Sequence, residues 1–365
     1  MPRIILFPGD GVGPEVVAEA VKVLTAVERR FGQSFEIESC AIGGDALDRY
    51  GVPLRVEDIE STRRADAALL GAVGGPKWDA VEPSLRPERG LLQLRKDLGL
   101  FANLRPVSVM PELAASSPLK PEIIANVDLL VVRELTGGIY FGEPSRRWTD
   151  DRGRAAVDTL VYREHEIERI VRLAFELARS RRGRVASVDK SNVLQSSRLW
   201  REIAIEVGAE FPDVQLQHVL VDAMAMHLVK SPGAFDVIVT ENMFGDILSD
   251  EASVLPGSIG LLPSASLSER AGQAAGTRFG LYEPIHGSAP DIAGRGEANP
   301  AGTILSAALM LRWSLALDDA AGAIERAVTD TISAGVRTPD IAEVGIRPVS
   351  TSTFGDEVAR RVEAG

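Results

Sequence analysis

Two aspartates, Asp246 and Asp250, stand four residues apart in the segment 242–253, which has a helical pattern. On a helix this spacing projects both carboxylates from one face, about 6 Å apart. A third carboxylate, Asp222, directly follows the strand predicted at 214–221, and ligands gather at strand ends in α/β sheets. Oxygen ligands suit Mg²⁺ or Mn²⁺. The pattern alone leaves two interpretations open: a metal site, and an acidic helix face in solvent.

Three arginines could hold a dicarboxylate, because guanidinium groups bind carboxylates bidentately. They are Arg95, Arg105 and Arg133. Arg133 directly follows the apolar run 127–132, where a charge is unfavourable unless it faces an anion. Helical spacing places an apolar wall and a carboxylate on the same face as Arg95, namely Glu88, Leu91 and Leu92. Taken singly, each arginine could equally be a surface or salt-bridging residue, and the two leucines could be core.

A lysine and a tyrosine are candidates for proton transfer. Lys190 ends the strand that starts at residue 184, and Tyr140 lies in the glycine-rich turn 137–142. Lysine and tyrosine can act as general base and general acid where histidine is absent. The chain has four histidines, none with the spacing of a metal site, and only His286 is expected near a ligand.

The small-residue segment 283–294 precedes a helical stretch. Backbone N–H groups in such a loop can hold phosphates, and a carboxylate such as Asp291 can accept hydrogen bonds from both ribose hydroxyls. Without further context this segment could also be a plain surface loop.

A second glycine-rich segment, from Gly9 to Gly13, follows a predicted strand and precedes a helix. Its spacing differs from the dinucleotide-binding fingerprint, which needs two residues between its second and third glycines. We therefore interpret it as a tight strand–helix turn, not as a pyrophosphate cradle.

The elements that must position these residues alternate along the chain, which predicts an α/β fold with a largely buried sheet. Strands are predicted at residues 3–7, 65–73, 127–132, 184–188, 214–221 and 235–240. Helices are predicted at residues 14–31, 164–181, 196–207 and 242–253, with a mostly helical C-terminal third from residue 300. A turn-rich β segment interrupts the pattern at 137–161.

The composition narrows the class of protein. A chain of 365 residues suits two domains, and a net charge of -12 argues against binding nucleic acid or an anionic membrane surface. Cys40 is the only cysteine, so an internal disulfide is excluded. We expect a soluble, cytoplasmic protein, since there is no signal-peptide pattern and no run near the ~18 apolar residues of a membrane span.

Taken together, the segments resemble the β-decarboxylating dehydrogenase family, which includes isopropylmalate and isocitrate dehydrogenases. The resemblance covers essentially the whole chain, through PGDGVGPE, GAVGGPKWD at 71–79, RPERGLLQLRKDLGLFANLRP, RELTGGIYFGE, VDKSNVL, ENMFGDILSDEAS and EPIHGSAPDIAGRGEANP. The GGPKWD segment and the leucines at 91 and 92 are similar to the isopropylmalate branch. That branch oxidises (2R,3S)-3-isopropylmalate with NAD and releases CO2 in leucine biosynthesis.

The resemblance implies a role for each candidate. Arg95, Arg105 and Arg133 would bind the substrate's carboxylates, and Lys190 and Tyr140 would move protons. Asp246 and Asp250 of one subunit, with Asp222 of a second copy, would hold Mg²⁺ or Mn²⁺, and Asp222 would also face the substrate. The pocket for the isopropyl group would consist of Glu88, Leu91, Leu92 and Val193.

NAD would bind two segments of the chain. The residues implied are Gly75, Pro76, Lys77, Trp78, Glu88, His286, Gly287, Ser288, Ala289, Pro290, Asp291, Ile292, Ala293 and Asn299. Asp291 predicts NAD over NADP, because its carboxylate would repel a 2′-phosphate.

The implied fold has two domains and a large mixed sheet, and it is not a Rossmann fold. A cofactor-binding domain would comprise residues 1–101 and 254–365. Residues 102–253 would carry the substrate and metal residues and the homodimer interface, with a β arm near 137–161. Three alternatives remain: a sibling activity on D-malate, tartrate, homoisocitrate or isocitrate, a non-catalytic regulatory subunit, and a pure binding protein.

Overall fold

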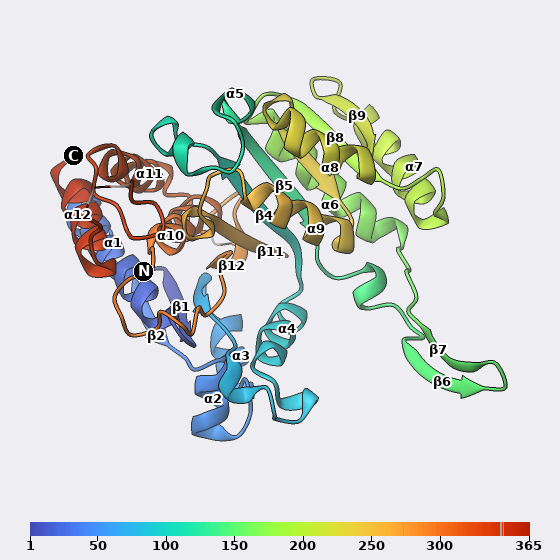
Figure 1. The fold of residues 1–365 in the computed structure, drawn as a ribbon, viewed down its shortest axis with the longest axis horizontal. Coiled ribbons are helices and arrows are strands. Elements are labelled where there is room, and N and C mark those ends of the chain that lie inside the picture. The colour runs from blue at the N-terminus through green and yellow to red at the C-terminus, as the bar shows by residue number, and fades with distance from the viewer. Residues whose placement is uncertain (273, 344, 346) are drawn as a thin grey trace. The chain divides into compact units, whose positions relative to one another are not determined.

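The computed structural model describes residues 1–272, 274–343, 345 and 347–365. The chain divides into two compact units. Unit 1 consists of Met1–Leu100, Met110–Ser117 and Pro256–Gly365, and unit 2 consists of Phe101–Val109 and Pro118–Leu255. Both are α/β, as predicted, and Figure 1 labels their elements.

Unit 1 is built on a mixed sheet with the strand order β2 (Glu36–Ser39), β1 (Arg3–Gly9), β3 (Ala67–Ala72), β12 (Arg278–Pro284) and β11 (Pro263–Ala271). Neighbouring strands run parallel except β11 and β12, which are antiparallel. Strand β3 is buried at every position. A continuous apolar run of this kind is typical of a parallel strand covered on both faces.

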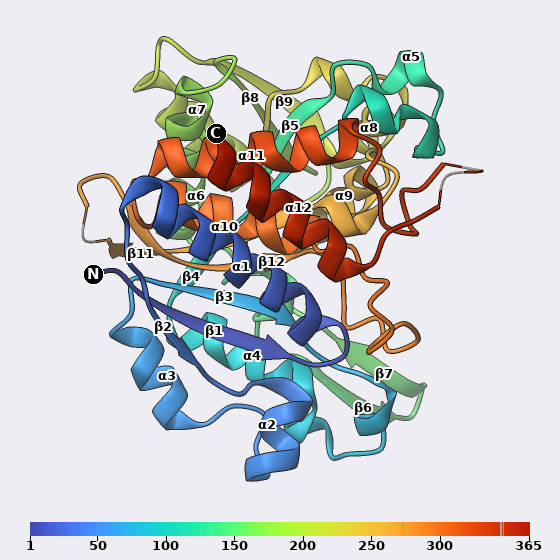
Figure 2. The same ribbon diagram turned by 90° about the vertical axis from the view of Figure 1, so that its left-hand side faces the viewer.

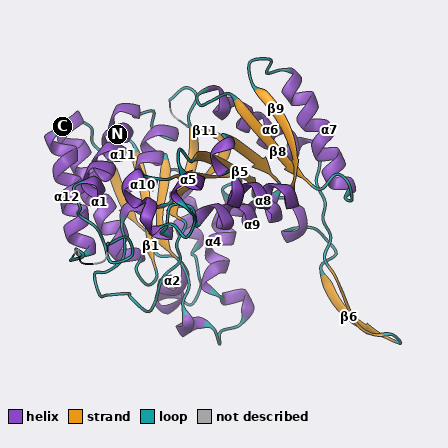
Figure 3. Cartoon of the chain, turned by 45° about the horizontal axis from the view of Figure 1, so that its top comes forward, coloured by secondary structure: helices purple, strands orange, loops and turns teal. Residues whose placement is uncertain are grey.

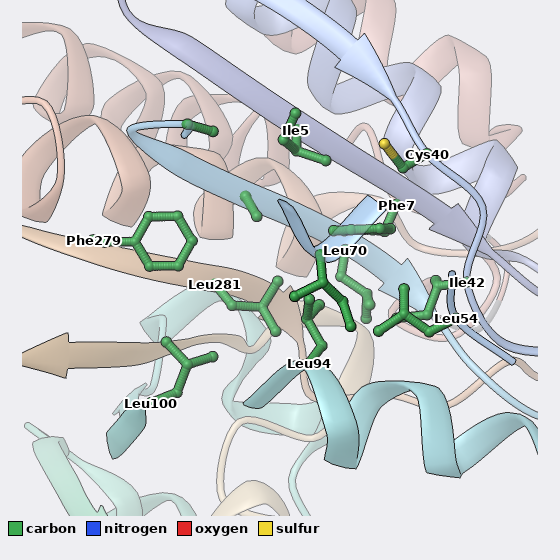
Figure 4. Close-up of a cluster of buried hydrophobic side chains, with 13 residues drawn as sticks. Ile5, Phe7, Cys40, Ile42, Leu54, Leu70, Leu94, Leu100, Phe279 and Leu281 are labelled. Atoms are coloured by element: carbon green, nitrogen blue, oxygen red, sulfur yellow. The ribbon is translucent and has the colours of Figure 1, made fainter. Parts of the chain in front are cut away.

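Helices cover both faces of the sheet of unit 1 (Figure 2). On one face, α1 (Gly13–Phe31) and α10 (Ala301–Trp313) contact the strands, and α11 (Asp318–Ser333) and α12 (Thr351–Ala364) pack against these two helices. The other face carries α2 (Gly43–Tyr50), α3 (Val56–Arg63) and α4 (Pro87–Asp97). Alternate strand residues such as Phe7 and Leu70 point to this second face and form one buried cluster with Ile42, Leu54 and Leu94 (Figure 4). Helix α4 is thereby fixed to the sheet.

Unit 2 has the strand order β4 (Leu100–Ser108), β5 (Asp128–Glu134), β10 (Val237–Thr240), β8 (Arg184–Asp189) and β9 (Gln215–Leu220). β4 is antiparallel to β5, and the other neighbours are parallel. The helices of this unit are α5 (Pro121–Ile124), α6 (Glu164–Arg179), α7 (Gln195–Ala209), α8 (Val221–Lys230) and α9 (Asn242–Ser253). Short 3₁₀ helices in the two units are η1 (Pro76–Trp78), η2 (Pro83–Leu85), η3 (Pro111–Ser116), η4 (Gly138–Tyr140), η5 (Pro232–Ala234) and η6 (Ile259–Leu261). The parallel strands of unit 2 all end at one edge, where Tyr140, Lys190, Asp222 and α9 follow.

A two-stranded antiparallel hairpin, β6 (Arg146–Asp150) and β7 (Gly153–Val157), accounts for the turn-rich β segment predicted at 137–161. Figure 3 shows it at the end of two extended segments, apart from the other elements of unit 2. All five residues of β6 are exposed.

The predicted elements are confirmed, with small differences at their ends. The helix predicted at 242–253 has the same bounds in the structure. The strand predicted at 214–221 ends at Leu220, because Val221 opens α8, a helix that the sequence pattern did not predict. No helix within the described residues combines the length and apolar character needed to cross a membrane.

Candidate active site

Helix α9 presents Asp246 and Asp250, as the spacing predicted. Its first residues are fixed by Glu241, whose carboxylate accepts hydrogen bonds from the backbone N–H groups of Met243 (3.1 Å) and Phe244 (2.8 Å). Glu241 is buried, and this burial raises the pKa of its carboxyl group.

Both aspartates of α9 are paired with predicted substrate-binding residues. Arg133 forms an ion pair with Asp246, and Arg105 Nη1 lies 2.7 Å from Asp250 Oδ1. The hydroxyl of Tyr140 donates to Asp246 Oδ2 at 2.9 Å. Unit 2 therefore brings five predicted site residues together. Two carboxylates four residues apart repel each other, and here the arginines offset that repulsion.

Arg133 is buried, and it lies within β5 instead of just beyond the strand, since β5 extends to Glu134. Its Nε and Nη2 donate to Asn242 Oδ1 at 3.1 and 2.9 Å. The amide of Asn242 donates in turn to the carbonyl of Gly137 at 3.0 Å. Sequence reasoning missed Asn242, although it precedes Asp246 by four residues on the same helix. It connects the arginine to the segment that carries Tyr140.

Tyr140 ends the short helix η4, and its side chain is half exposed. Partial burial and the hydrogen bond to Asp246 raise the pKa of its hydroxyl. The phenol therefore keeps its proton at neutral pH, which a proton donor requires.

Lys190 and Asp222 form a second pair in unit 2. Lys190 follows β8, Asp222 lies in the first turn of α8, and Lys190 Nζ lies 2.6 Å from Asp222 Oδ1. This hydrogen bond lowers the pKa of the Asp222 carboxyl. The turn after β8 is held by Asp189, which accepts from Arg201 at 2.8 and 3.0 Å.

The three predicted metal ligands do not gather in one copy of the chain. Among the described residues, no group of three or more histidine, cysteine, aspartate or glutamate side chains could hold a metal ion. Asp246 and Asp250 offer oxygen donors on one helix face, which suits Mg²⁺ or Mn²⁺, whereas Asp222 is paired with Lys190. Val193, predicted to line the substrate pocket, is 63% exposed near this pair.

Helix α4 of unit 1 carries the remaining substrate candidates. Arg95 Nη2 lies 2.5 Å from Glu283 Oε1, and the Glu283 side chain is buried at the end of β12. Arg95 Nε is buried and has no hydrogen-bond partner within the described part of the chain, so it can still donate to an anion. Leu91 packs against the core cluster, while Leu92 is 43% exposed. Sequence reasoning missed Glu283.

The predicted cofactor segment 75–78 is attached to α2. Lys77 Nζ and Trp78 Nε1 both donate to Asp48, at 2.5 and 3.1 Å. The Trp78 indole lies over Gly44, where any Cβ would overlap the ring. Glu88 lies close to the start of the same segment. Its Oε1 is 2.6 Å from the place where a Cβ atom on Gly74, the residue before Gly75, would lie. Sequence reasoning did not find Asp48.

The second cofactor segment, residues 286–299, is a loop between β12 and α10. His286 Nδ1 lies 2.9 Å from the carbonyl oxygen of Gly287, whereas its Nε2 is buried and lacks a partner among the described residues. Burial also lowers the pKa of this imidazole, so a neutral ring can bond a ligand. An unpaired buried nitrogen here fits a bound cofactor.

The other predicted residues of this loop differ in exposure. Asp291 is exposed and Ser288 is buried. Asn299 already uses both ends of its amide, because Nδ2 donates to Asp340 and Oδ1 accepts from the N–H of Ala301, each at 3.0 Å. In this structure Asn299 therefore fixes the start of α10. The remaining predicted loop residues are Gly287, Ala289, Pro290, Ile292 and Ala293.

The fold and these groups agree with a family of known proteins. The sequence profile described as "Isocitrate/isopropylmalate dehydrogenase" matches residues 3–358. The chain belongs to this family, which confirms the resemblance found in its motifs.

The two relatives by sequence are named for the isopropylmalate branch, whereas the similar solved structure is an isocitrate dehydrogenase. The chain is 57% identical, over 98% of both sequences, to 3-isopropylmalate dehydrogenase of Xanthomonas euvesicatoria pv. vesicatoria. It is 58% identical, over 99% of this chain and 95% of the relative, to 3-isopropylmalate dehydrogenase of Geobacillus kaustophilus. The crystal structure of isocitrate dehydrogenase from Methylococcus capsulatus is similar, with a TM-score of 0.85, 36% identity and full coverage of both chains.

Proposed function

We propose that this protein oxidises (2R,3S)-3-isopropylmalate with NAD, giving 4-methyl-2-oxopentanoate, CO2 and NADH in leucine biosynthesis. The observation that carries the proposal is the group of two arginines and a tyrosine around Asp246 and Asp250. Relatives named 3-isopropylmalate dehydrogenase, at 57–58% identity, support the choice of substrate. The protein would act in the cytoplasm.

Substrate binding would use the three arginines and one apolar wall. Arg105 and Arg133 are paired with the carboxylates of Asp250 and Asp246, and substrate carboxylates are chemically equivalent acceptors. Arg95 Nε, which has no hydrogen-bond partner among the residues that the structure describes, would serve the same purpose. The isopropyl group would contact the pocket residues Glu88, Leu91, Leu92 and Val193. Each CH₂ transferred from water contributes about 0.8 kcal/mol.

Mg²⁺ or Mn²⁺ would be held by Asp246 and Asp250 of one copy and Asp222 of another, with Asp222 also facing the substrate. When bound, the cation supplies a positive charge that stabilises negative charge on the substrate's oxygens. The donor set of carboxylate oxygens suits these two ions.

Lys190 and Tyr140 would move the protons. Lys190 would take the proton of the substrate's hydroxyl as a neutral amine, so its ammonium group, now paired with Asp222, must first release a proton to solvent. After loss of CO2, Tyr140 would donate its phenolic proton to the enol carbon, and its raised pKa keeps that proton in place until then. Lys190 would thus act in the oxidation step, and Tyr140 in the protonation that follows the loss of CO2.

Unit 1 would hold NAD, which when bound would supply the hydride acceptor. The segment from Gly75 to Trp78 with Glu88 would form one side of its site, and the loop from His286 to Asn299 would form the other. Asp291 would accept hydrogen bonds from the ribose and disfavour a 2′-phosphate, hence NAD over NADP. Unit 1 would be the cofactor-binding domain, and unit 2 would carry the substrate and metal residues.

A homodimer with shared active sites would bring Asp222 and Lys190 of one copy to Asp246 of the other. Helices α8 and α9 pack together, and both expose apolar side chains. Met226, Val229 and Ile247 are 65%, 48% and 60% exposed. Neighbouring exposed apolar residues on adjacent helices are typical of a subunit interface.

Mixing two inactive variants tests the shared site. Tyr140→Phe and Lys190→Ala subunits, unfolded and refolded together, would form mixed dimers with one intact site each. Random pairing then restores about a quarter of wild-type activity. No recovery, with mixed dimers detected by native mass spectrometry, would contradict the sharing of sites.

The reaction itself is tested by following its products. Purified protein with Mg²⁺, NAD and 3-isopropylmalate should release NADH, CO2 and 4-methyl-2-oxopentanoate in equal amounts, and EDTA should abolish all three. NADH without CO2 would contradict the decarboxylation, and no product at all would favour a regulatory subunit.

A further inference from the structure

The turn between β1 and α1 has no part in the proposed chemistry, yet it contacts both segments proposed to bind the cofactor. The backbone N–H of Asp10 donates to the carbonyl of Ala72 at 2.8 Å, just before the first segment. The N–H of Val12 donates to the carbonyl of Ser288 at 2.9 Å, within the second. One short turn is thus hydrogen-bonded to chain segments more than 200 residues apart.

Glycines make this close approach possible. Gly9 and Gly11 have φ angles of +71° and +58°, a left-handed conformation that other residues rarely adopt. A Cβ on Gly9 would overlap the carbonyl of Ala72, and one on Gly11 would overlap the carbonyl of Ser288. The glycines from Gly9 to Gly13, whose spacing differs from the dinucleotide fingerprint, therefore allow close contact between backbone segments.

The Asp10 side chain secures the first cofactor segment. It is 4% exposed. Oδ2 accepts from the N–H groups of Gly44 and Gly74, and Oδ1 accepts from that of Asp45, each at 2.8 Å. One buried carboxylate thereby joins the start of α2 to the residue that precedes Gly75. Helix α2 also carries Asp48, which holds Lys77 and Trp78.

Glu15, in the first turn of α1, secures the second segment. Its two carboxylate oxygens accept from the N–H groups of Gly294 and Gly296, the latter at 3.1 Å. Beside it, Val12 and Val16 form a small apolar cluster with Ala298, and this cluster is extended by Ala289, Ile292 and Ala293. The loop is thus attached to α1 both by hydrogen bonds to the Glu15 carboxylate and by apolar contacts.

We propose that Asp10 and Glu15 are positioning residues for the dinucleotide. This inference rests on the proposed function, in which the two segments bind the cofactor. They contact neither reacting atoms nor substrate. Instead, each carboxylate holds backbone N–H groups in or beside one cofactor segment. The segment is then ordered before the cofactor binds, so less conformational entropy is lost on binding. Their loss should weaken cofactor binding and leave the rate at saturating NAD unchanged.

The test uses Glu15→Gln, because glutamine keeps the shape but offers one acceptor oxygen instead of two. In the cofactor-free protein, backbone amide hydrogens of residues 289–298 should exchange with solvent about tenfold faster than in wild type. NADH should bind about tenfold more weakly. The kcat at saturating NAD and the KM for 3-isopropylmalate should stay unchanged. Glu28→Gln is the matched control: Glu28 lies on the same helix and accepts one backbone N–H, that of Phe35, at 2.7 Å. It should leave exchange at 289–298 and NADH binding as in wild type.

Asp10→Asn provides a second, independent test at the other segment. Exchange at 72–75 should accelerate while exchange at 289–298 remains slow, and NADH binding should again weaken. Unchanged exchange in Glu15→Gln, or faster exchange with unchanged NADH affinity, would overturn the inference. Wild-type protein that binds NADH but does not oxidise 3-isopropylmalate would refute the proposed function alone.

Discussion

Replacing Tyr140 with phenylalanine removes a single oxygen, and its effect on activity should be far larger than its effect on stability. The lost hydroxyl makes one hydrogen bond, 2.9 Å to Asp246, from a side chain that is 51% exposed. Because water can replace that bond, the free energy of unfolding should fall by less than about 1 kcal/mol. General acid catalysis contributes about 10²- to 10⁴-fold to rate, so kcat should fall within that range.

Steady-state kinetics and thermal unfolding separate these two effects. We expect the KM for 3-isopropylmalate to change by less than about threefold, because the arginines remain. Tyr50→Phe is the matched control, since Tyr50 is 45% exposed and its ring would keep its contact with Arg55. A Tyr140→Phe enzyme with nearly wild-type kcat would refute the assignment of Tyr140 as proton donor. A low kcat with a much lower melting temperature would attribute the loss to unfolding instead.

Three further predictions follow from particular contacts. Asp246→Asn removes a proposed metal ligand, so activity should fall at least about 100-fold and the Mg²⁺ concentration for half-activation should rise; unchanged Mg²⁺ dependence would contradict the ligand set. Asn242→Ala removes the acceptor of Arg133 Nε and Nη2, so the KM for 3-isopropylmalate should rise about tenfold; an unchanged KM would show that Arg133 is oriented without it. Burial raises the pKa of the Cys40 thiol to about 12 from 9.0, so iodoacetamide at pH 8 should label Cys40 only in unfolded protein, as mass spectrometry can check. Rapid labelling of folded protein would contradict that burial.

The elements that local patterns predicted are present, because their signals lie within a few residues, but the patterns missed the strands β2, β4, β11 and β12. The helical pattern at 242–253 correctly placed Asp246 and Asp250 on one face. Where strand and helix adjoin without a turn residue, the pattern missed the helix. Asp222 follows β9 as expected, and it already lies in the first turn of α8. The pocket wall of Leu91 and Leu92 stays a prediction: Leu91 is partly buried and packs against the core cluster, and Leu92 is exposed.

The residues that sequence reasoning missed act through long-range contacts. Glu283 pairs with Arg95 across 188 residues of sequence, and Asn242 orients Arg133 across 109. Neither partner can be paired from spacing, because the sheet order brings them together. An acidic residue ending the apolar strand β12 was nevertheless a usable signal, since a buried carboxylate needs a partner.

The most direct test of the proposed function compares substrates side by side. The ratio kcat/KM would be measured with Mg²⁺ for 3-isopropylmalate, D-malate and isocitrate, each with NAD and with NADP. We predict the highest value for 3-isopropylmalate with NAD, since the leucines favour an isopropyl group and a third carboxylate facing them would lose its hydration unpaired. A higher value for isocitrate or D-malate would contradict the roles of Leu91 and Leu92, and preference for NADP would contradict that of Asp291.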